Sequence, residues 1–263
     1  MWNPYRPLEP EQARILGIVG VVVVLVVWSV LSGAGIVSPV RLPAPWDVGG
    51  ALVQLSWDAN RGESPLLIAT LWSLGRVIAA GILVVAIGVP LGIAMGASPR
   101  INAVLSPLVD PFRSAPIVAV LPILVMWMGI GEAMKVTFLF LGAVVYLVPM
   151  VRDAIRAVPS QYYTSAVDLG ATELEAVRLA LVPMALPRIA DAITVGVSVM
   201  WTYITVAEYV NAEKGLGQLI QNARRFSAMD QVFAGIIVII ALALITYTLM
   251  VALRRRLFAW ETS

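Results

Sequence analysis

The chain has 263 residues, of which 60% are hydrophobic and 13% are charged, and its formal net charge is +2 at pH 7. A water-soluble domain of this length would carry fewer apolar and more charged residues, so the composition predicts a protein of the lipid bilayer. The absence of cysteine and histidine excludes disulfides, zinc-thiolate and histidine-ligated metal sites, and Cys-His or Ser-His catalysis.

Six hydrophobic runs are long enough, or nearly so, to cross about 30 Å of hydrocarbon. The run that comes first is longer than the apolar core of a signal peptide and lacks a clean cleavage site after it, so we interpret it as a span. The sequence therefore predicts an all-α, six-span bundle forming a single transmembrane domain over residues 15–253. The runs lie at residues 15–32, 66–96, 115–130, 134–151, 188–209 and 232–253.

The basic residues predict the orientation, because cytoplasmic loops are richer in Lys and Arg. Both termini, residues 1–14 and 254–263, are expected in the cytoplasm together with the segment 152–187. That placement puts the larger basic group inside: Arg6, Arg14, Arg100, Arg113, Arg152, Arg156, Arg178, Arg188 and Arg254 to Arg256. The smaller group falls outside: Arg41, Arg61, Lys135, Lys214, Arg224 and Arg225.

The run at 66–96 contains one arginine and a glycine repeat. An arginine within a span is costly, so Arg76 is expected to bind a passing anion, to pair with Glu208, or to extend to the headgroups. Gly88, Gly92 and Gly96 are spaced by four residues, which predicts the close approach of a neighbouring helix.

The run at 115–130 begins at Pro116 and is interrupted by Pro122. Prolines leave carbonyls unpaired at membrane depth, and such carbonyls are tolerated where they are buried in protein or line a cavity. Met126 and Met128 are therefore candidates for the lining of a translocation pathway, with ordinary helix packing as the alternative.

The stretch DLGATELEAVRLALVPMALP, residues 168–187, is unusually polar for this chain. Pro159 and Ser160 predict the start of a short helix, Gly170 its left-handed end, and Thr172 with Glu175 a capping box that starts another. Pro183 and Pro187 are expected to punctuate the entry into the next span. The apolar side of this short helix pair is expected to lie on the lipid interface or to fill a groove in a cytoplasmic partner.

The run at 188–209 carries a polar stripe, because residues spaced by three and four share one face of a helix. For Thr194 and Ser198, we expect a seam between helices in which the hydroxyls bond back to the helix backbone. Trp201 and Glu208 are candidates for a pore or gate, or for structural roles. The stripe is Thr194, Ser198, Trp201, Thr205 and Glu208. In the loop that follows, Gly215 and Gly217 predict a sharp turn before an amphipathic helix.

The segment TSAVDLGATELEAVRLALVP resembles the cytoplasmic signature of ABC importer permeases, which reads EAA, three residues, G, nine residues, I, one residue, L, P. Gly170 matches the glycine and Pro183 the proline. The departures are Thr164, Ser165 and Ala166 for EAA, Ala180 for Ile and Val182 for Leu. Similarity over roughly residues 40–260 points to the nitrate, sulfonate, taurine and bicarbonate branch of type I ABC permeases.

This resemblance implies a homodimeric pore in the bacterial inner membrane, two ABC ATPase subunits and an extracytoplasmic solute-binding protein; lipid is a further partner, and nucleic acid is not. The chain itself is expected to be no enzyme and to hold no cofactor, with ATP and Mg²⁺ bound by the ATPase. Neither of its two lysines, Lys135 and Lys214, stands in a phosphate-binding loop. The residues implied to contact the ATPase are Thr164, Ser165, Ala166, Asp168, Leu169, Gly170, Ala171, Thr172, Glu173, Glu175 and Pro183.

Two other classes of function remain alternatives. A stand-alone ion-coupled transporter would use Arg76 and Glu208 as coupling groups, and an integral-membrane enzyme would need a convergent catalytic set. Neither alternative accounts for the capped helix pair around Gly170. The expected pathway residues are Arg76, Met126, Met128, Ser198, Trp201, Thr205 and Glu208.

Overall fold

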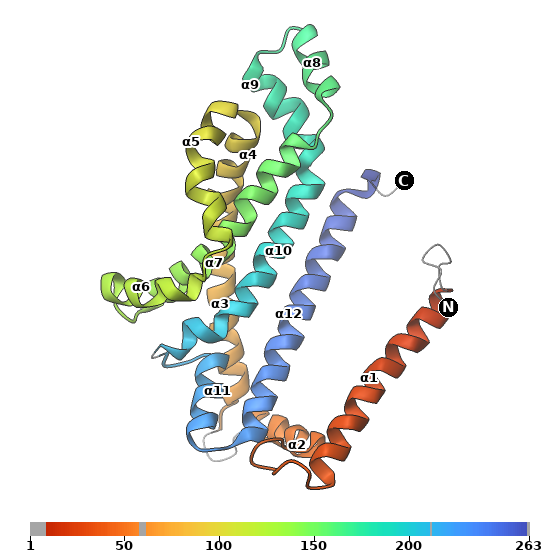
Figure 1. The fold of residues 1–263 in the computed structure, drawn as a ribbon, viewed down its shortest axis with the longest axis vertical. Coiled ribbons are helices and arrows are strands. Elements are labelled where there is room, and N and C mark those ends of the chain that lie inside the picture. Colours follow the sequence, from red (N-terminus) through yellow and green to blue (C-terminus); the bar gives the residue numbers. More distant parts are fainter. Residues whose placement is uncertain (1–8, 58–61, 211, 262–263) are drawn as a thin grey trace. The chain divides into compact units, whose positions relative to one another are not determined.

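The computed structural model describes residues 9–57, 62–210 and 212–261, and the regular elements in these ranges are all helices (Figure 1). Arg6 and Arg61, used above for the orientation, lie outside the described residues. The α-helices are α1 (Pro10–Gly33), α2 (Pro45–Ser56), α3 (Pro65–Leu83), α4 (Val89–Ala97), α5 (Pro99–Val109), α6 (Leu121–Met128), α7 (Glu132–Arg156), α8 (Ser160–Asp168), α9 (Glu173–Ala176), α10 (Val182–Tyr209), α11 (Leu216–Arg225) and α12 (Met229–Leu257).

The chain divides into two compact units, Met1–Leu66 with Ile220–Ile236, and Leu67–Leu219 with Ile237–Ser263. In the first unit, α2 buries Val48 and Ala51 in a small apolar cluster with Ala234 of α12. Trp28 of α1 packs beside this cluster.

The larger unit is built around α7, on which α4 and α10 pack (Figure 1). Its core consists of large apolar side chains that exclude solvent entirely, among them Phe138 and Leu147 of α7 and Met200 and Ile204 of α10. This central helix carries one candidate site at each of its ends.

Among the residues that the structure describes, five helices are long and apolar enough to cross a membrane: Glu11–Gly33, Pro65–Ala97, Glu132–Arg156, Glu173–Tyr209 and Met229–Leu257. The run at 115–130, which the sequence predicted to be one of six spans, does not form a single helix of this kind. Its helical part, Ile117–Met128, is bent by 100° from Pro99–Arg113, so a further span arises only if this pair counts as one. Pro116 causes the bend, because its ring disfavours a helical conformation at the residue before it and it has no N–H.

Two of the long helices contain a π-helical turn two residues before a proline. The turns are Val84–Gly88, before Pro90, and Val177–Leu181, before Pro183. A proline lacks an N–H and crowds the carbonyl four residues earlier, and the wider π turn takes up this misfit without ending the helix. Pro183 and Pro187 therefore lie inside a helix and do not mark its start, since Glu173–Tyr209 is one continuous helix.

The glycine repeat brings α4 and the π turn before it against α7, as the spacing predicted. A Cβ atom at Gly92 would lie 2.6 Å from Val151 Cβ and 2.9 Å from Val148 O. A Cβ atom at Gly96 would lie 2.7 Å from Ile155 Cβ. Because part of the obstruction is backbone, the two helices would have to move apart to admit any side chain.

Replacing Gly92 with alanine is expected to destabilise the protein by about 1–3 kcal/mol, the typical range for overpacking. The measurement is the unfolding free energy in detergent by denaturant titration. Gly75→Ala in α3 is the matched control, since a Cβ there meets nothing within 4 Å and alanine favours a helix over glycine by roughly 0.5–1 kcal/mol. Equal stability of the two variants would contradict the contact between α4 and α7.

Candidate functional site

The first candidate site is the tip segment, residues 160–181, which connects α7 to α10. The short α8 ends in a left-handed glycine, Gly170, with φ of +94°. The N–H of Gly170 donates to Val167 O at 2.8 Å, and the N–H of Ala171 donates to Ala166 O at 3.0 Å. This bonding pattern is a Schellman motif, which confirms the predicted end of the helix.

A capping box begins the next helix, as predicted. The N–H of Thr172 donates to Glu175 Oε2 at 2.9 Å, and the N–H of Glu175 donates to Thr172 Oγ1 at 3.4 Å. These bonds satisfy backbone donors that the first turn of a helix would otherwise leave unpaired. Both ends of the turn around Gly170 are thus fixed by local interactions.

The tip segment exposes apolar side chains that the rest of its unit does not cover. Leu169 is 89% exposed, and Leu174 is 66% exposed. Beyond them, α9 runs through its π turn directly into α10. A displacement of α9 would therefore be carried into α10 without an intervening loop.

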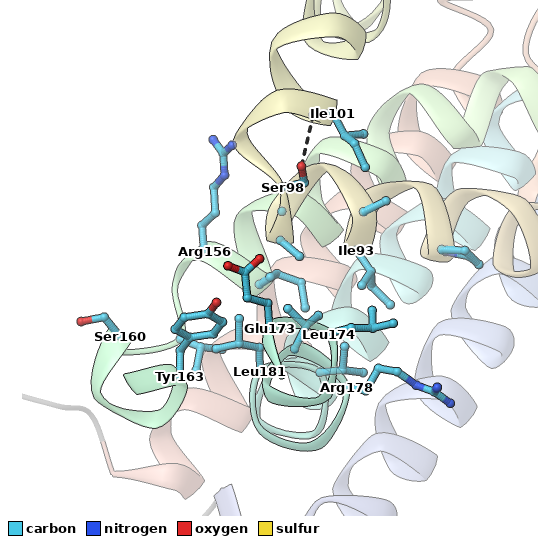
Figure 2. Close-up of a pocket in the computed structure, with 18 residues that line it drawn as sticks. Ile93, Ser98, Ile101, Arg156, Ser160, Tyr163, Glu173, Leu174, Arg178 and Leu181 are labelled. Atoms are coloured by element: carbon cyan, nitrogen blue, oxygen red, sulfur yellow. Dashed lines mark hydrogen bonds between the residues drawn. The ribbon is translucent and has the colours of Figure 1, made fainter. Parts of the chain in front are cut away.

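A cavity of about 920 Å³ lies behind the tip segment (Figure 2). One wall is formed by α4 and α5, with Ile93 and Ile101, and the other by α8 and α9, with Tyr163, Glu173 and Leu174. Figure 2 shows Tyr163 and Glu173 on the tip side of the cavity. The walls are largely apolar, and the space separates the tip segment from the neighbouring helices.

The C-terminal part of α12 lies near the same end of the larger unit. Arg254 Nε lies 3.2 Å from Asp191 Oδ1 in the first part of α10. This pair joins the C-terminal part of α12, which carries the three consecutive arginines 254–256, to α10.

The second candidate site is the clasp at the opposite end of α7 and α10, made of Ser73, Arg76 and Glu208 with residues 214–217. Glu208 is completely buried, and its Oε1 accepts hydrogen bonds from Arg76 Nη1 and Ser73 Oγ, both at 2.7 Å. Its Oε2 accepts from the N–H of Gly217 at 2.7 Å. The expected pairing of Arg76 with Glu208 is present.

The clasp holds the turn after α10 against α3. Arg76 Nη1 donates to Lys214 O at 2.8 Å, and the N–H of Leu216 donates to Ser73 Oγ at 2.9 Å. Gly215 has φ of +138°, and a Cβ there would lie 2.5 Å from Glu208 Cδ. The predicted sharp turn thus depends on a glycine that fits between the backbone and the carboxylate.

The other expected pathway residues have varied surroundings. The hydroxyls of Thr194 and Ser198 donate back to Ala190 O and Thr194 O, both at 2.9 Å, as expected for them. Trp201 is buried and Thr205 is half-buried, whereas Met126 and Met128 are exposed on α6, which projects from the bundle in Figure 1. The methionines therefore lie apart from the stripe on α10.

Sequence reasoning missed two charged residues beside the clasp. Glu132 accepts from Arg76 Nε at 2.6 Å and from Arg76 Nη2 at 2.7 Å, and Lys135 Nζ donates to Glu132 Oε1 at 3.2 Å. We call Arg76, Glu132 and Lys135 the Glu132 cluster. The only signal in the sequence was the spacing of Glu132 and Lys135, since acid and base three residues apart share a helix face.

Comparison with known proteins identifies the class to which this chain belongs. Residues 88–259 match the family of binding-protein-dependent transport system inner membrane components. The chain is 34% identical to the taurine transport system permease protein of Escherichia coli (strain K12), over 89% of this chain and 86% of that protein. It is 29% identical to a Bacillus subtilis (strain 168) protein described as an aliphatic sulfonates transport permease protein, over 90% of this chain and 84% of that protein.

The fold agrees with solved structures of the same class. A chain from inward-facing conformations of the MetNI methionine ABC transporter superimposes with a TM-score of 0.66 at 22% sequence identity, covering 73% of this chain and 95% of that chain. The protein belongs to the binding-protein-dependent transport system inner membrane component family. It is a multi-pass permease of an ABC importer and a membrane component of a transport complex.

Proposed function

We propose that this permease imports a small sulfonate, taurine or a related alkanesulfonate, and that it does so as a homodimer with two ATPase subunits and an extracytoplasmic solute-binding protein. The coupling of the permease to its ATPase is supported above all by the tip segment. This segment exposes Leu169 and Leu174, and it is continuous with the long membrane helix Glu173–Tyr209. The sulfonate class is supported by the similarity to the taurine and aliphatic sulfonate relatives.

In this proposal, the tip segment occupies a cleft of the ATPase on the cytoplasmic side. Binding of ATP and Mg²⁺ by the ATPase closes its dimer and moves the two tip segments, and each displaces α10 as a rigid body. The access of the pathway then changes from the inner to the outer side, and hydrolysis reverses the change. The placement of the tip segment on the cytoplasmic side is supported by Arg254 to Arg256, because basic residues favour the cytoplasmic end of a span.

The test is taurine uptake into liposomes containing the permease with its ATPase subunits. Uptake is expected only with ATP inside the vesicles and loaded binding protein outside, because the chain has no phosphate-binding loop of its own. An ATPase variant that binds but does not hydrolyse ATP is the control and should not sustain uptake. Uptake by the permease alone, driven by an ion gradient, would overturn the proposal and favour a secondary transporter.

A further inference from the structure

The Glu132 cluster borders a cavity of about 370 Å³, to which Trp72 and Lys214 also contribute walls. The two cations of the cluster are buried, since Arg76 and Lys135 are each 3% exposed, whereas the side chain of Glu132 is 48% exposed. The carboxylate is therefore the one charged group of this cluster that borders open space on a large part of its surface.

Both cations are also held by groups other than Glu132. Arg76 Nη1 remains bonded to Glu208 and to Lys214 O, and Lys135 Nζ donates to Ile130 O at 3.1 Å. Rotation of the Glu132 side chain would leave the Nε and Nη2 edge of Arg76 and the Lys135 ammonium in place, without the carboxylate. That edge is the planar fork that binds two oxygens of an oxyanion.

From this geometry we propose that Arg76 and Lys135 form a binding site for a small sulfonate, and that the Glu132 carboxylate occupies the site until the anion displaces it. Two buried cations balanced by the carboxylate of Glu208 alone would be costly, so the site holds either the Glu132 carboxylate or the ligand. Trp72 forms an apolar wall, with Arg76 Cζ at 5.6 Å and Lys214 Nζ at 5.8 Å from its ring centroid.

The proposal deepens the import function and rests on it for the class of ligand. The cavity lies at the low end of the range of about 300–1,000 Å³ typical of small-molecule sites. Glu208, by contrast, is fully buried with every carboxylate oxygen bonded, so it positions Arg76 and does not exchange with a ligand. On the proposed orientation, the site lies at the outer end of α7, where a delivered anion enters.

The test is rescue of a Glu132→Gln variant by methanesulfonate. Removing this carboxylate leaves Arg76 and Lys135 with Glu208 as their one remaining counter-charge, so the purified permease should melt at a lower temperature than wild type in chloride buffer. Adding methanesulfonate at constant ionic strength should restore the melting temperature in a saturable way, because a ligand that binds the folded state stabilises it. Wild-type protein should bind methanesulfonate at least about tenfold more weakly, because the tethered carboxylate competes at high effective concentration.

Glu213→Gln is the matched control, because Glu213 borders the same cavity, while Arg76 and Lys135 both pair with Glu132. The control should show no methanesulfonate-dependent gain. Equal gains in both variants, equal rescue by the neutral analogue dimethyl sulfone, or no rescue of Glu132→Gln would each overturn the proposal.

If Glu132→Gln accumulates poorly, its yield is compared after purification with and without methanesulfonate. A higher yield with the anion supports the site, and equal yields contradict it. Neither readout requires transport, so failure here leaves taurine import to be judged by the uptake assay. Failed uptake, conversely, would remove the import function without abolishing the rescue.

Discussion

Replacing Glu208 with glutamine is expected to lower the unfolding free energy by about 3–5 kcal/mol, the range for breaking a buried ion pair by removing one partner. The glutamine amide would present a donor either to Arg76 and Ser73 or to the N–H of Gly217, all of which now donate to the carboxylate. A fully buried donor without an acceptor is the costly case. The measurement is denaturant titration of the purified permease in detergent.

The controls for Glu208→Gln separate burial from charge. Glu213→Gln removes the same charge from an exposed position and is expected to change stability by less than about 0.5 kcal/mol. A double variant with Arg76→Met should be less destabilised than the sum of the single variants, because the two side chains are directly bonded. If the losses of unfolding free energy in the two single variants simply add up in the double variant, Arg76 and Glu208 do not stabilise each other.

Replacing Gly170 with valine is expected to abolish ATP-driven uptake in the reconstituted complex while leaving membrane insertion intact. A Cβ atom at this position meets nothing within 4 Å, so the damage comes from the backbone, whose φ of +94° a β-branched residue resists. The turn between α8 and α9 would then change direction, and the exposed Leu169 and Leu174 would change position relative to one another. Uptake and substrate-stimulated ATP hydrolysis are the measurements.

Gly170→Asn is the control for this prediction, since asparagine tolerates left-handed φ better than other side chains. It should retain most of the activity that valine removes. If valine leaves substrate-stimulated hydrolysis unchanged, the tip segment does not couple the permease to its ATPase.

Local signals in the sequence predicted the turn around Gly170 well. The Schellman end of α8 and the capping box of α9 each depend on residues within five positions of one another, so their geometry is encoded locally. The effect of Pro183 was not predictable from the same rules, because a proline either ends a helix or is accommodated by a wider turn. Which outcome occurs depends on packing against α8 and the rest of the bundle.

The charged residues illustrate the limits of sequence reasoning at longer range. Arg76 and Glu208 were conspicuous because charges within apolar runs require a partner, and their pairing was one of the expected outcomes. Glu132 was missed because it stands at the first turn of α7, where an acidic residue is common and favourable without any tertiary partner. Only the folded structure, in which Arg76 of α3 pairs with Glu132 of α7, reveals this partner.

The continuous helix Glu173–Tyr209 contains 37 residues, which at about 1.5 Å per residue gives a length of about 55 Å. This rod is anchored near one extremity by the carboxylate of Glu208, and Leu174 stands near the other. A pivoting of only about 5° around the anchor would sweep Leu174 sideways by about 4 Å, which follows from the rise per residue. A small rotation of the helix about Glu208 thus produces a displacement of Leu174 comparable to the width of a side chain.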